Sequence, residues 1–219
     1  MKKLLLKPKL LIVAASMIAF ASCVSETEPI LVEEENTSLE ILNSETSGGE
    51  NLRKGDRVER AYFERFSNQL RQVDANDVPV SPQTIPAFFP GVGVGNSTHM
   101  GKAMTFLNQV SQLGENGLET VGAPVTQFFS DELSDLGITE IPDIVSSVTT
   151  DGKGNSVWFK NINNVVTPES ETKFNFQAEV EIVGGTGKFE GATGEGTVVG
   201  FFDPTNGSGE STIRGEIKY

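Results

Sequence analysis

Residues 174–202 read FNFQAEVEIVGGTGKFEGATGEGTVVGFF and contain the pattern that decides the fold. From Phe174 to Ile182 apolar and polar residues alternate, so the apolar side chains point to one face and the polar side chains to the other. This alternation predicts a strand with one buried side and one solvent-facing side. The segment from Thr197 to Phe202 carries apolar residues on both faces, which predicts a second strand that is covered more completely.

A glycine cluster, Gly184 to Gly196, joins these two segments. It differs from a phosphate-binding Walker A loop because Phe189, and not serine or threonine, follows Lys188 and a strand comes next. A dinucleotide-binding fingerprint is excluded because it also requires a following helix. We interpret the cluster as a sharp corner between two tightly packed strands, with Gly187 and Gly191 at positions that tolerate neither a side chain nor a negative φ angle. The corner glycines are Gly184, Gly185, Gly187, Gly191 and Gly194.

Further strands and hairpins are predicted on both sides of the corner. Residues 212–219 repeat the alternating pattern, and Asn206-Gly207 supplies the positive φ angles of a hairpin loop before them. Upstream, segments 145–149 and 157–162 flank a hairpin turn at 151–155, and residues 100–110 are another candidate strand. This turn is not a calcium loop, because Lys153 stands where an oxygen ligand is needed. Recurrent hairpins without helix–strand alternation predict a sandwich or a closed barrel.

Two other segments have a helical spacing of apolar residues. Between residues 124 and 136 this spacing is accompanied by Pro124 in the first turn and Gly137 just after the end, which predicts a short helix inserted between strands. From Val58 to Val73 every third or fourth residue is apolar, so the spacing alone favours a helix there as well.

Four segments together resemble a known group of barrels. They are GGTGKFEGATGEG at 184–196, THMGK at 98–102, DGKGN at 151–155 and the closing GEIKY at 215–219. In this order they are similar to bacterial members of the allene oxide cyclase-like and dirigent-like β-barrels, over residues 57–219. The resemblance implies an antiparallel β-barrel of about eight strands, and a strand rather than a helix at 61–73. The helix at 124–136 is an insertion relative to that pattern, and we expect it to cover a barrel mouth.

The resemblance implies no particular activity, because none of the catalytic residues of those proteins can be matched here. An eight-stranded barrel is either filled by its own side chains or holds one small ligand. The only histidine, His99, is expected to pack at a strand end with one ring nitrogen hydrogen-bonded. Without a second histidine, neither a metal site nor a cofactor is expected. Trp158 and Phe159 are adjacent in a strand, so one faces inward and the other outward. The candidate pocket residues are Thr98, His99, Asn155 and Trp158.

The first residues, MKKLLLKPKLLIVAASMIAFASC, form an export signal. Lysines precede an apolar run from Leu10 to Phe20 that is shorter than the ~20 residues of a membrane-spanning helix. Residues 20–23, Phe-Ala-Ser-Cys, resemble the bacterial lipobox, with Phe20 in place of the commoner leucine. The resemblance implies cleavage before Cys23 and acylation of Cys23, which palmitate labelling would detect. Cys23 is the only cysteine, so an internal disulfide is excluded.

Composition divides the chain into a lipoprotein signal peptide (1–22), an acidic segment that begins at lipidated Cys23 (23–52) and a β-barrel domain (53–219). Residues 24–52 carry eight glutamates, no basic residue and no aromatic residue. Such a segment buries too little apolar surface to offset the entropy of ordering, so we expect a disordered tether. Residues 25–28, Ser-Glu-Thr-Glu, are similar to the acidic signal that sends some bacterial lipoproteins to the cell surface. A linker with no sorting role is the alternative.

The acidic balance of the chain limits its partners. The formal charge is −13, and removal of residues 1–22 takes away four lysines and no acidic residue, which leaves −17. A protein of this charge is repelled by nucleic acid and by anionic headgroups. We expect a lipid-anchored binding or structural module of the outer membrane, in contact with a small apolar ligand or an envelope protein. The alternative is an isomerase or cyclase that acts on an apolar small molecule in the barrel lumen.

Overall fold

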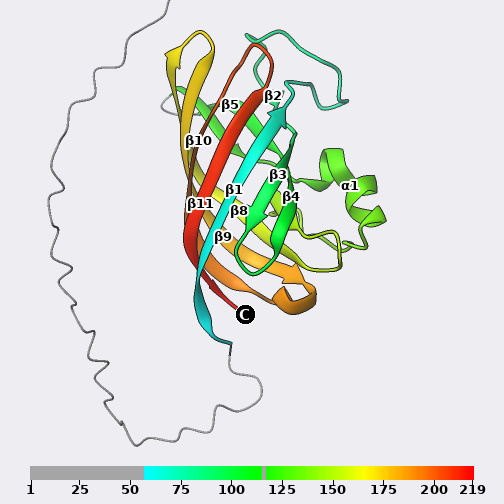
Figure 1. Cartoon of the computed structure of the whole chain (residues 1–219). Helices are drawn as coiled ribbons and strands as arrows, with labels where there is room; N and C mark the ends of the chain where they lie inside the picture. Colours follow the sequence, from blue (N-terminus) through cyan, green and yellow to red (C-terminus); the bar gives the residue numbers. More distant parts are fainter. Residues whose placement is uncertain (1–56, 115–116) are drawn as a thin grey trace, which may run out of the picture. The chain divides into compact units, whose positions relative to one another are not determined.

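The computed structural model describes residues 57–114 and 117–219, and its centre is a closed antiparallel barrel of eight strands (Figure 1). The expectation of an eight-stranded barrel with a short helical insertion is therefore confirmed. The predicted signal peptide, Cys23 and the predicted acidic tether lie outside the described residues. In order around the barrel, the strands are β1 (Glu59–Leu70), β11 (Ser208–Lys218), β10 (Thr193–Phe202), β9 (Lys173–Thr186), β8 (Ser156–Ser170), β7 (Ser147–Thr150), β4 (Gly101–Leu107) and β3 (Gly91–Ser97).

A second, smaller sheet and one helix are inserted between β1 and β7. The sheet has the order β2 (Ala87–Phe88), β5 (Gln109–Gly114) and β6 (Gly117–Gly122), and β6 also contacts β8. The helix α1 (Thr126–Asp135) follows β6, and Gly137 comes just after it with a φ angle of +73°. The helix predicted between residues 124 and 136 is confirmed.

The glycine corner connects β9 to β10 at the end of the barrel where the chain also finishes (Figure 1). The corner contains a short 3-10 turn, η1 (Gly187–Phe189), and we call this end of the barrel the corner end. Gly187 and Gly191 have φ angles of +60° and +64°, as the sequence predicted. At the opposite end, Gly207 turns the β10–β11 hairpin with a φ angle of +77°.

Residues 59–70 form strand β1, so the helix predicted from the spacing over 58–73 was wrong, and the strand implied by the family resemblance at 61–73 is observed as far as Leu70. Along β1 the inward residues Tyr62, Glu64, Phe66 and Asn68 are all buried. Two of these four are polar, which interrupts the apolar–polar alternation that normally reveals a strand. The remaining apolar residues then fall at a spacing that imitates a helix.

Helix α1 packs on the outer wall of the barrel, not over a mouth as the sequence suggested. Its buried residues Phe129 and Leu133 contact Phe106 of β4 and Val148 of β7. Both of these strand residues alternate with lumen-facing ones, so they belong to the outer face. The apolar spacing of α1 is therefore explained by a second hydrophobic core outside the barrel.

The main core fills the lumen near the corner end. Its fully buried members include Val157, Phe159, Phe189 and Ile217, and the Tyr62 and Phe159 rings lie 5.9 Å apart. Phe189 belongs to the glycine corner, and its fully buried side chain packs into this end of the core. Trp158 packs against the outer core and its Nε1 donates to Ser156 Oγ at 2.8 Å. Of these two adjacent aromatic residues, Phe159 therefore packs in the core inside the lumen and Trp158 packs against the core outside the barrel.

Strand β10 differs from its prediction on one face. The segment 197–202 was expected to be covered on both sides, but Val199 is 44 % exposed and Phe201 is 36 % exposed. These side chains point outward from the barrel, and no element of the described chain covers them. Val199 lines the groove described next.

Candidate functional site

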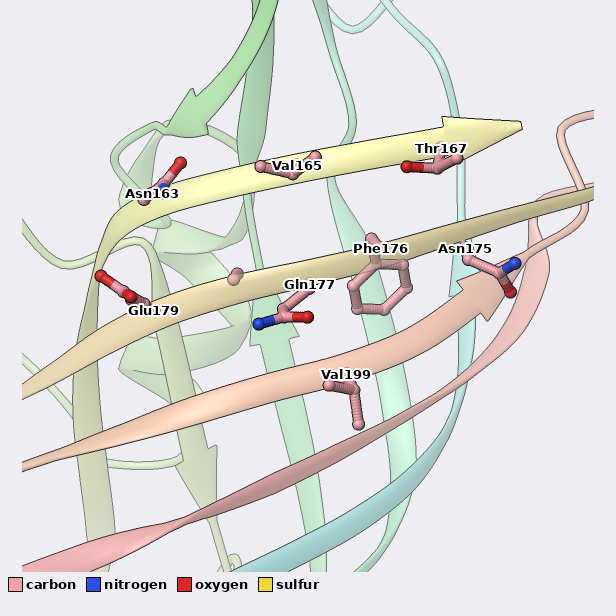
Figure 2. A pocket seen from close by; sticks show the side chains of 9 residues that line it. Asn163, Val165, Thr167, Asn175, Phe176, Gln177, Glu179 and Val199 are labelled. Atoms are coloured by element: carbon pink, nitrogen blue, oxygen red, sulfur yellow. The ribbon is translucent and has the colours of Figure 1, made fainter. Parts of the chain in front are cut away.

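A groove of about 400 Å³ lies on the outer wall of β8, β9 and β10. Figure 2 shows its side chains in parallel files, with Asn163, Val165 and Thr167 along β8 and Asn175, Gln177 and Glu179 along β9. Hydrogen-bonded pairing of the strands aligns these files into three rows across the wall. The rows are Asn163–Glu179–Thr197, Val165–Gln177–Val199 and Thr167–Asn175–Phe201.

The rows place the polar residues of β9 between Val165 on β8 and Val199 on β10, each of which is the apolar residue at the middle of its strand segment. The central file on β9 holds two amides and one carboxylate, while Val165 is 56 % exposed on one side and Val199 is exposed on the other. Strand alternation explains the arrangement, because the outward residues of three adjacent strands necessarily stand side by side. The groove can therefore offer hydrogen bonds from its floor and aliphatic contacts from its sides.

The side-chain amides of the groove differ in whether they already form hydrogen bonds within the protein. Asn175 donates from Nδ2 to Glu169 Oε2 at 2.8 Å, which leaves its oxygen free to accept. Within the described residues, the side-chain amides of Asn163 and Gln177 form no hydrogen bond with the protein. Each of these amides can both donate and accept, so a bound molecule would find complementary groups at adjacent positions.

A second candidate is a carboxyl group inside the barrel. Glu64 is 1 % exposed, and the Tyr62 hydroxyl donates to its Oε1 while Thr149 Oγ1 donates to its Oε2 at 3.2 Å. Ser97 Oγ lies 3.1 Å from the Tyr62 hydroxyl oxygen and extends the network. No basic side chain of the described residues forms an ion pair with Glu64. The cluster is therefore a buried acid held only by hydroxyl groups.

Burial controls the protonation of this cluster. Removal from water raises the pKa of Glu64 from its usual 4.5 to about 7, and the hydrogen bonds from Tyr62 and Thr149 offset part of that effect. Burial, and then the nearby Glu64 charge, raise the pKa of Tyr62 well above 10. Glu64 can therefore exchange a proton near neutral pH, which is a property of acid–base groups in enzymes.

The structure does not bring together the four pocket residues suggested by the sequence. Thr98, His99 and Asn155 lie at the corner end, where Thr98 Oγ1 accepts from the Phe63 backbone N–H at 2.9 Å. His99 Nε2 lies 3.1 Å from the Ala61 carbonyl oxygen, so the expected strand-end packing with one bonded ring nitrogen is observed. The Asn155 side chain completes the 151–155 turn by donating to Asp151 Oδ2 at 2.7 Å. Trp158 is on the outer face.

Sequence reasoning missed both candidates, although each has a signal in the sequence. Glu64 is a charged residue at an inward position of β1, and it stands out only once the segment is known to be a strand. For the groove, the signal is the apolar Val199 on the same side of the sheet as the polar Gln177, with the apolar Phe201 next to it along the strand. An outward apolar edge beside an outward amide file indicates a binding surface.

Among the described residues, no helix is long and apolar enough to cross a membrane. The same residues contain no group of three or more His, Cys, Asp or Glu side chains placed to hold a metal ion. No protein-family description, curated protein or solved structure matches the chain. The function must therefore be argued from the groove, the buried carboxyl and the sequence.

Proposed function

We propose that the protein is a lipid-anchored binding module of the cell envelope, and that it binds its ligand in the groove of β8, β9 and β10. The observation that carries the proposal is the groove itself, because it combines unengaged amides with exposed aliphatic side chains on a rigid sheet. Binding sites with these properties commonly have volumes of roughly 300–1,000 Å³. At about 400 Å³ the groove is large enough for a small ligand or for part of a longer one.

The anchor in this proposal is Cys23. The basic start, the short apolar run and the Phe-Ala-Ser-Cys sequence support processing as a lipoprotein, with the outer membrane as its location. Each buried methylene of an acyl chain contributes ~0.8 kcal/mol, and stable anchoring requires more than one chain. Acylation of Cys23 with diacylglycerol and a third chain satisfies that requirement.

We expect Cys23→Ser to abolish acylation and to release the protein from membranes, because serine provides no thiol for the thioether bond. The measurement is metabolic labelling with an alkyne analogue of palmitate, together with fractionation of the cells. The matched control is Ser22→Ala, which changes a neighbouring residue and keeps the thiol. Labelling that persists in Cys23→Ser would contradict the lipid anchor.

We expect Val199→Lys to eliminate ligand binding in the groove, because a long charged side chain would occupy the space beside Gln177. The position is exposed, so the cost in stability should stay within about 1 kcal/mol. The measurement is the thermal shift of the full-length protein in detergent with a panel of neutral sugars, fatty acids, flat aromatic compounds and short peptides. A ligand at a hundredfold its Kd adds about 2.7 kcal/mol of stability.

The control for this experiment is Val92→Lys, the same change at a 43 % exposed position on β3 that lines no groove. This variant should keep the shift seen with the wild type. A panel that shifts neither protein, or a ligand that binds equally well to Val199→Lys, would overturn the groove as the binding site.

The second candidate function is an isomerase or cyclase, and Glu64 is the observation that favours it. A carboxyl group with a pKa of about 7 beside a tyrosine is a suitable acid–base pair. Both Glu64 and Tyr62 are almost completely buried, however, and Phe159 and Phe189 pack the lumen toward the corner end. Conversion of a lipid-like or aromatic compound by the wild type, lost in Glu64→Gln, would favour this function over the binding module.

A further inference from the structure

We propose that the ligand of the groove is a neutral oligosaccharide, an inference that rests on the proposed function of the groove. The first argument is electrostatic. The groove is lined by one carboxylate, Glu179, and by no basic side chain. At flanking positions Lys173 is paired with Glu169 at 2.8 Å and Lys160 with Glu181 at 3.7 Å, and Arg214 of β11 lies beyond β10, opposite Thr197. Because no basic side chain lines the groove itself, phosphate, sulfate and carboxylate ligands would meet the Glu179 charge there.

The second argument concerns hydrogen bonding. A sugar hydroxyl donates one hydrogen bond and accepts others, and a primary amide does the same through its two ends. Asn163 and Gln177 offer both ends, Asn175 offers its oxygen, and Glu179 accepts from two hydroxyls. A site built to bond hydroxyls discriminates strongly against analogues that lack them, because its polar groups would then be left unpaired.

The third argument concerns shape. The groove follows the strand direction from Asn163 to Thr167, which is roughly 13 Å at about 3.3 Å per residue. A site of this length on an open wall can accommodate linked sugar rings that lie along the strands. The aliphatic groups of Val165 and Val199 border the groove and can contact the C–H surfaces of the rings (Figure 2).

A peptide added as an extra strand fits this surface poorly. Strand β9, at the centre of the groove, is hydrogen-bonded to β8 on one side and to β10 on the other. Its backbone groups are therefore occupied, whereas recognition by strand addition needs a free sheet edge. Only side chains are available in the groove, and its outward polar side chains are Asn163, Thr167, Asn175, Gln177 and Glu179.

The test uses the full-length protein in detergent, with maltohexaose, cellohexaose, xylohexaose and mannohexaose as probes in isothermal titration calorimetry. At least one of these hexasaccharides should bind. Asn163→Ala and Gln177→Ala should each weaken that binding about tenfold, because each removes hydrogen bonds to the sugar. The matched control is Gln112→Ala on β5, which removes an exposed amide that lines no groove and should leave the affinity unchanged.

Comparison probes separate this inference from the proposed function. A sulfated hexasaccharide and dodecanoate carry the negative charge that the groove should reject. If either binds and Val199→Trp prevents it by filling the groove without adding a charge, while the neutral hexasaccharides do not bind, the oligosaccharide inference is wrong and the groove remains a binding site. Neutral sugar binding that is indifferent to both Asn163→Ala and Gln177→Ala would overturn the inference as well. Unchanged melting curves of the variants establish that folding is intact.

Discussion

The free energy of unfolding is expected to fall as the pH rises from about 4.5 to about 7, and Glu64→Gln should remove most of this dependence. Burial raises the pKa of Glu64 in the folded protein to about 7, while the unfolded chain keeps the usual 4.5. Between these values the folded state binds a proton that the unfolded state has released. The stabilisation is therefore complete below pH 4.5 and is lost as the pH rises through 7.

The expected size of this effect follows from the two pKa values. At about 1.4 kcal/mol per pKa unit, the difference between 4.5 and about 7 corresponds to about 3 kcal/mol. Other carboxyl groups act in a different pH range. The pKa of Asp74 is lowered by backbone hydrogen bonds from Val78 and Asn76, and that of Asp203 by bonds from Thr205. Their stabilisation is lost only as the pH falls through the acid range, so it does not overlap with that of Glu64.

The measurement is urea unfolding of the wild type, Glu64→Gln and Glu195→Gln at a series of pH values between 4 and 8. Glutamine has nearly the shape of glutamic acid and keeps one oxygen for the Tyr62 hydroxyl. Glu64→Gln should therefore approach the wild type at low pH and exceed its stability by about 3 kcal/mol at pH 8. Glu195 is an exposed carboxyl on β10, and its variant should follow the wild-type profile. A Glu64→Gln profile parallel to the wild type would show that Glu64 is not the titrating group.

Gly187→Ala is expected to cost about 3 kcal/mol of stability, for two separate reasons. With φ at +60°, an alanine pays the left-handed backbone penalty of about 1–2 kcal/mol. Its methyl group would also lie 2.6 Å from both Asn155 Oδ1 and the Gly154 carbonyl oxygen. The second of these atoms is backbone in the 151–155 turn, so the contact is relieved only if the corner or the turn shifts.

Gly101→Ala isolates the first of these two costs. Gly101 has a φ angle of +76°, and no atom lies within 4 Å of the position that a methyl group would take. This variant should lose only about 1–2 kcal/mol. For a domain of this size, each kcal/mol lowers Tm by roughly 2–4 °C, so calorimetry should place Gly187→Ala clearly below Gly101→Ala. Equal melting temperatures of Gly187→Ala and Gly101→Ala would mean that the added methyl group at position 187 does not clash with the 151–155 turn.

Prediction from the sequence succeeded where the residues of a segment follow a single requirement, such as one buried face or one backbone conformation. Strand β9 has a buried face and a wet face, and its alternation from Ala178 to Ile182 shows both. Helix α1 has a single apolar stripe, so its period was readable. The backbone conformation and close packing at the corner can be satisfied only by glycine, so the sequence itself shows where the corner lies.

Prediction failed where polar residues are placed inside the barrel or apolar residues are exposed outside it, because the alternation then no longer indicates which face is buried. Strand β1 places Glu64 and Asn68 inside the barrel, so its pattern no longer reports which side is buried. Strand β10 exposes Val199 and Phe201 on its outer side, and an apolar residue in a strand does not reveal whether protein or solvent faces it. The groove also depends on the register of three strands, since Val165, Gln177 and Val199 become neighbours only through pairing. No local pattern contains that information.

The seam between β1 and β11 determines when the barrel can form. Val58 and Tyr219 exchange backbone hydrogen bonds of 3.2 and 3.4 Å, so the first and last described segments close the ring together. Contacts between such distant parts of a chain slow folding. Until β11 has been synthesised, β1 and β10 each keep an unpaired edge. Under the proposed export from the N-terminus, this order of events would keep the chain open while it is threaded across the membrane and would delay closure until β11 has crossed.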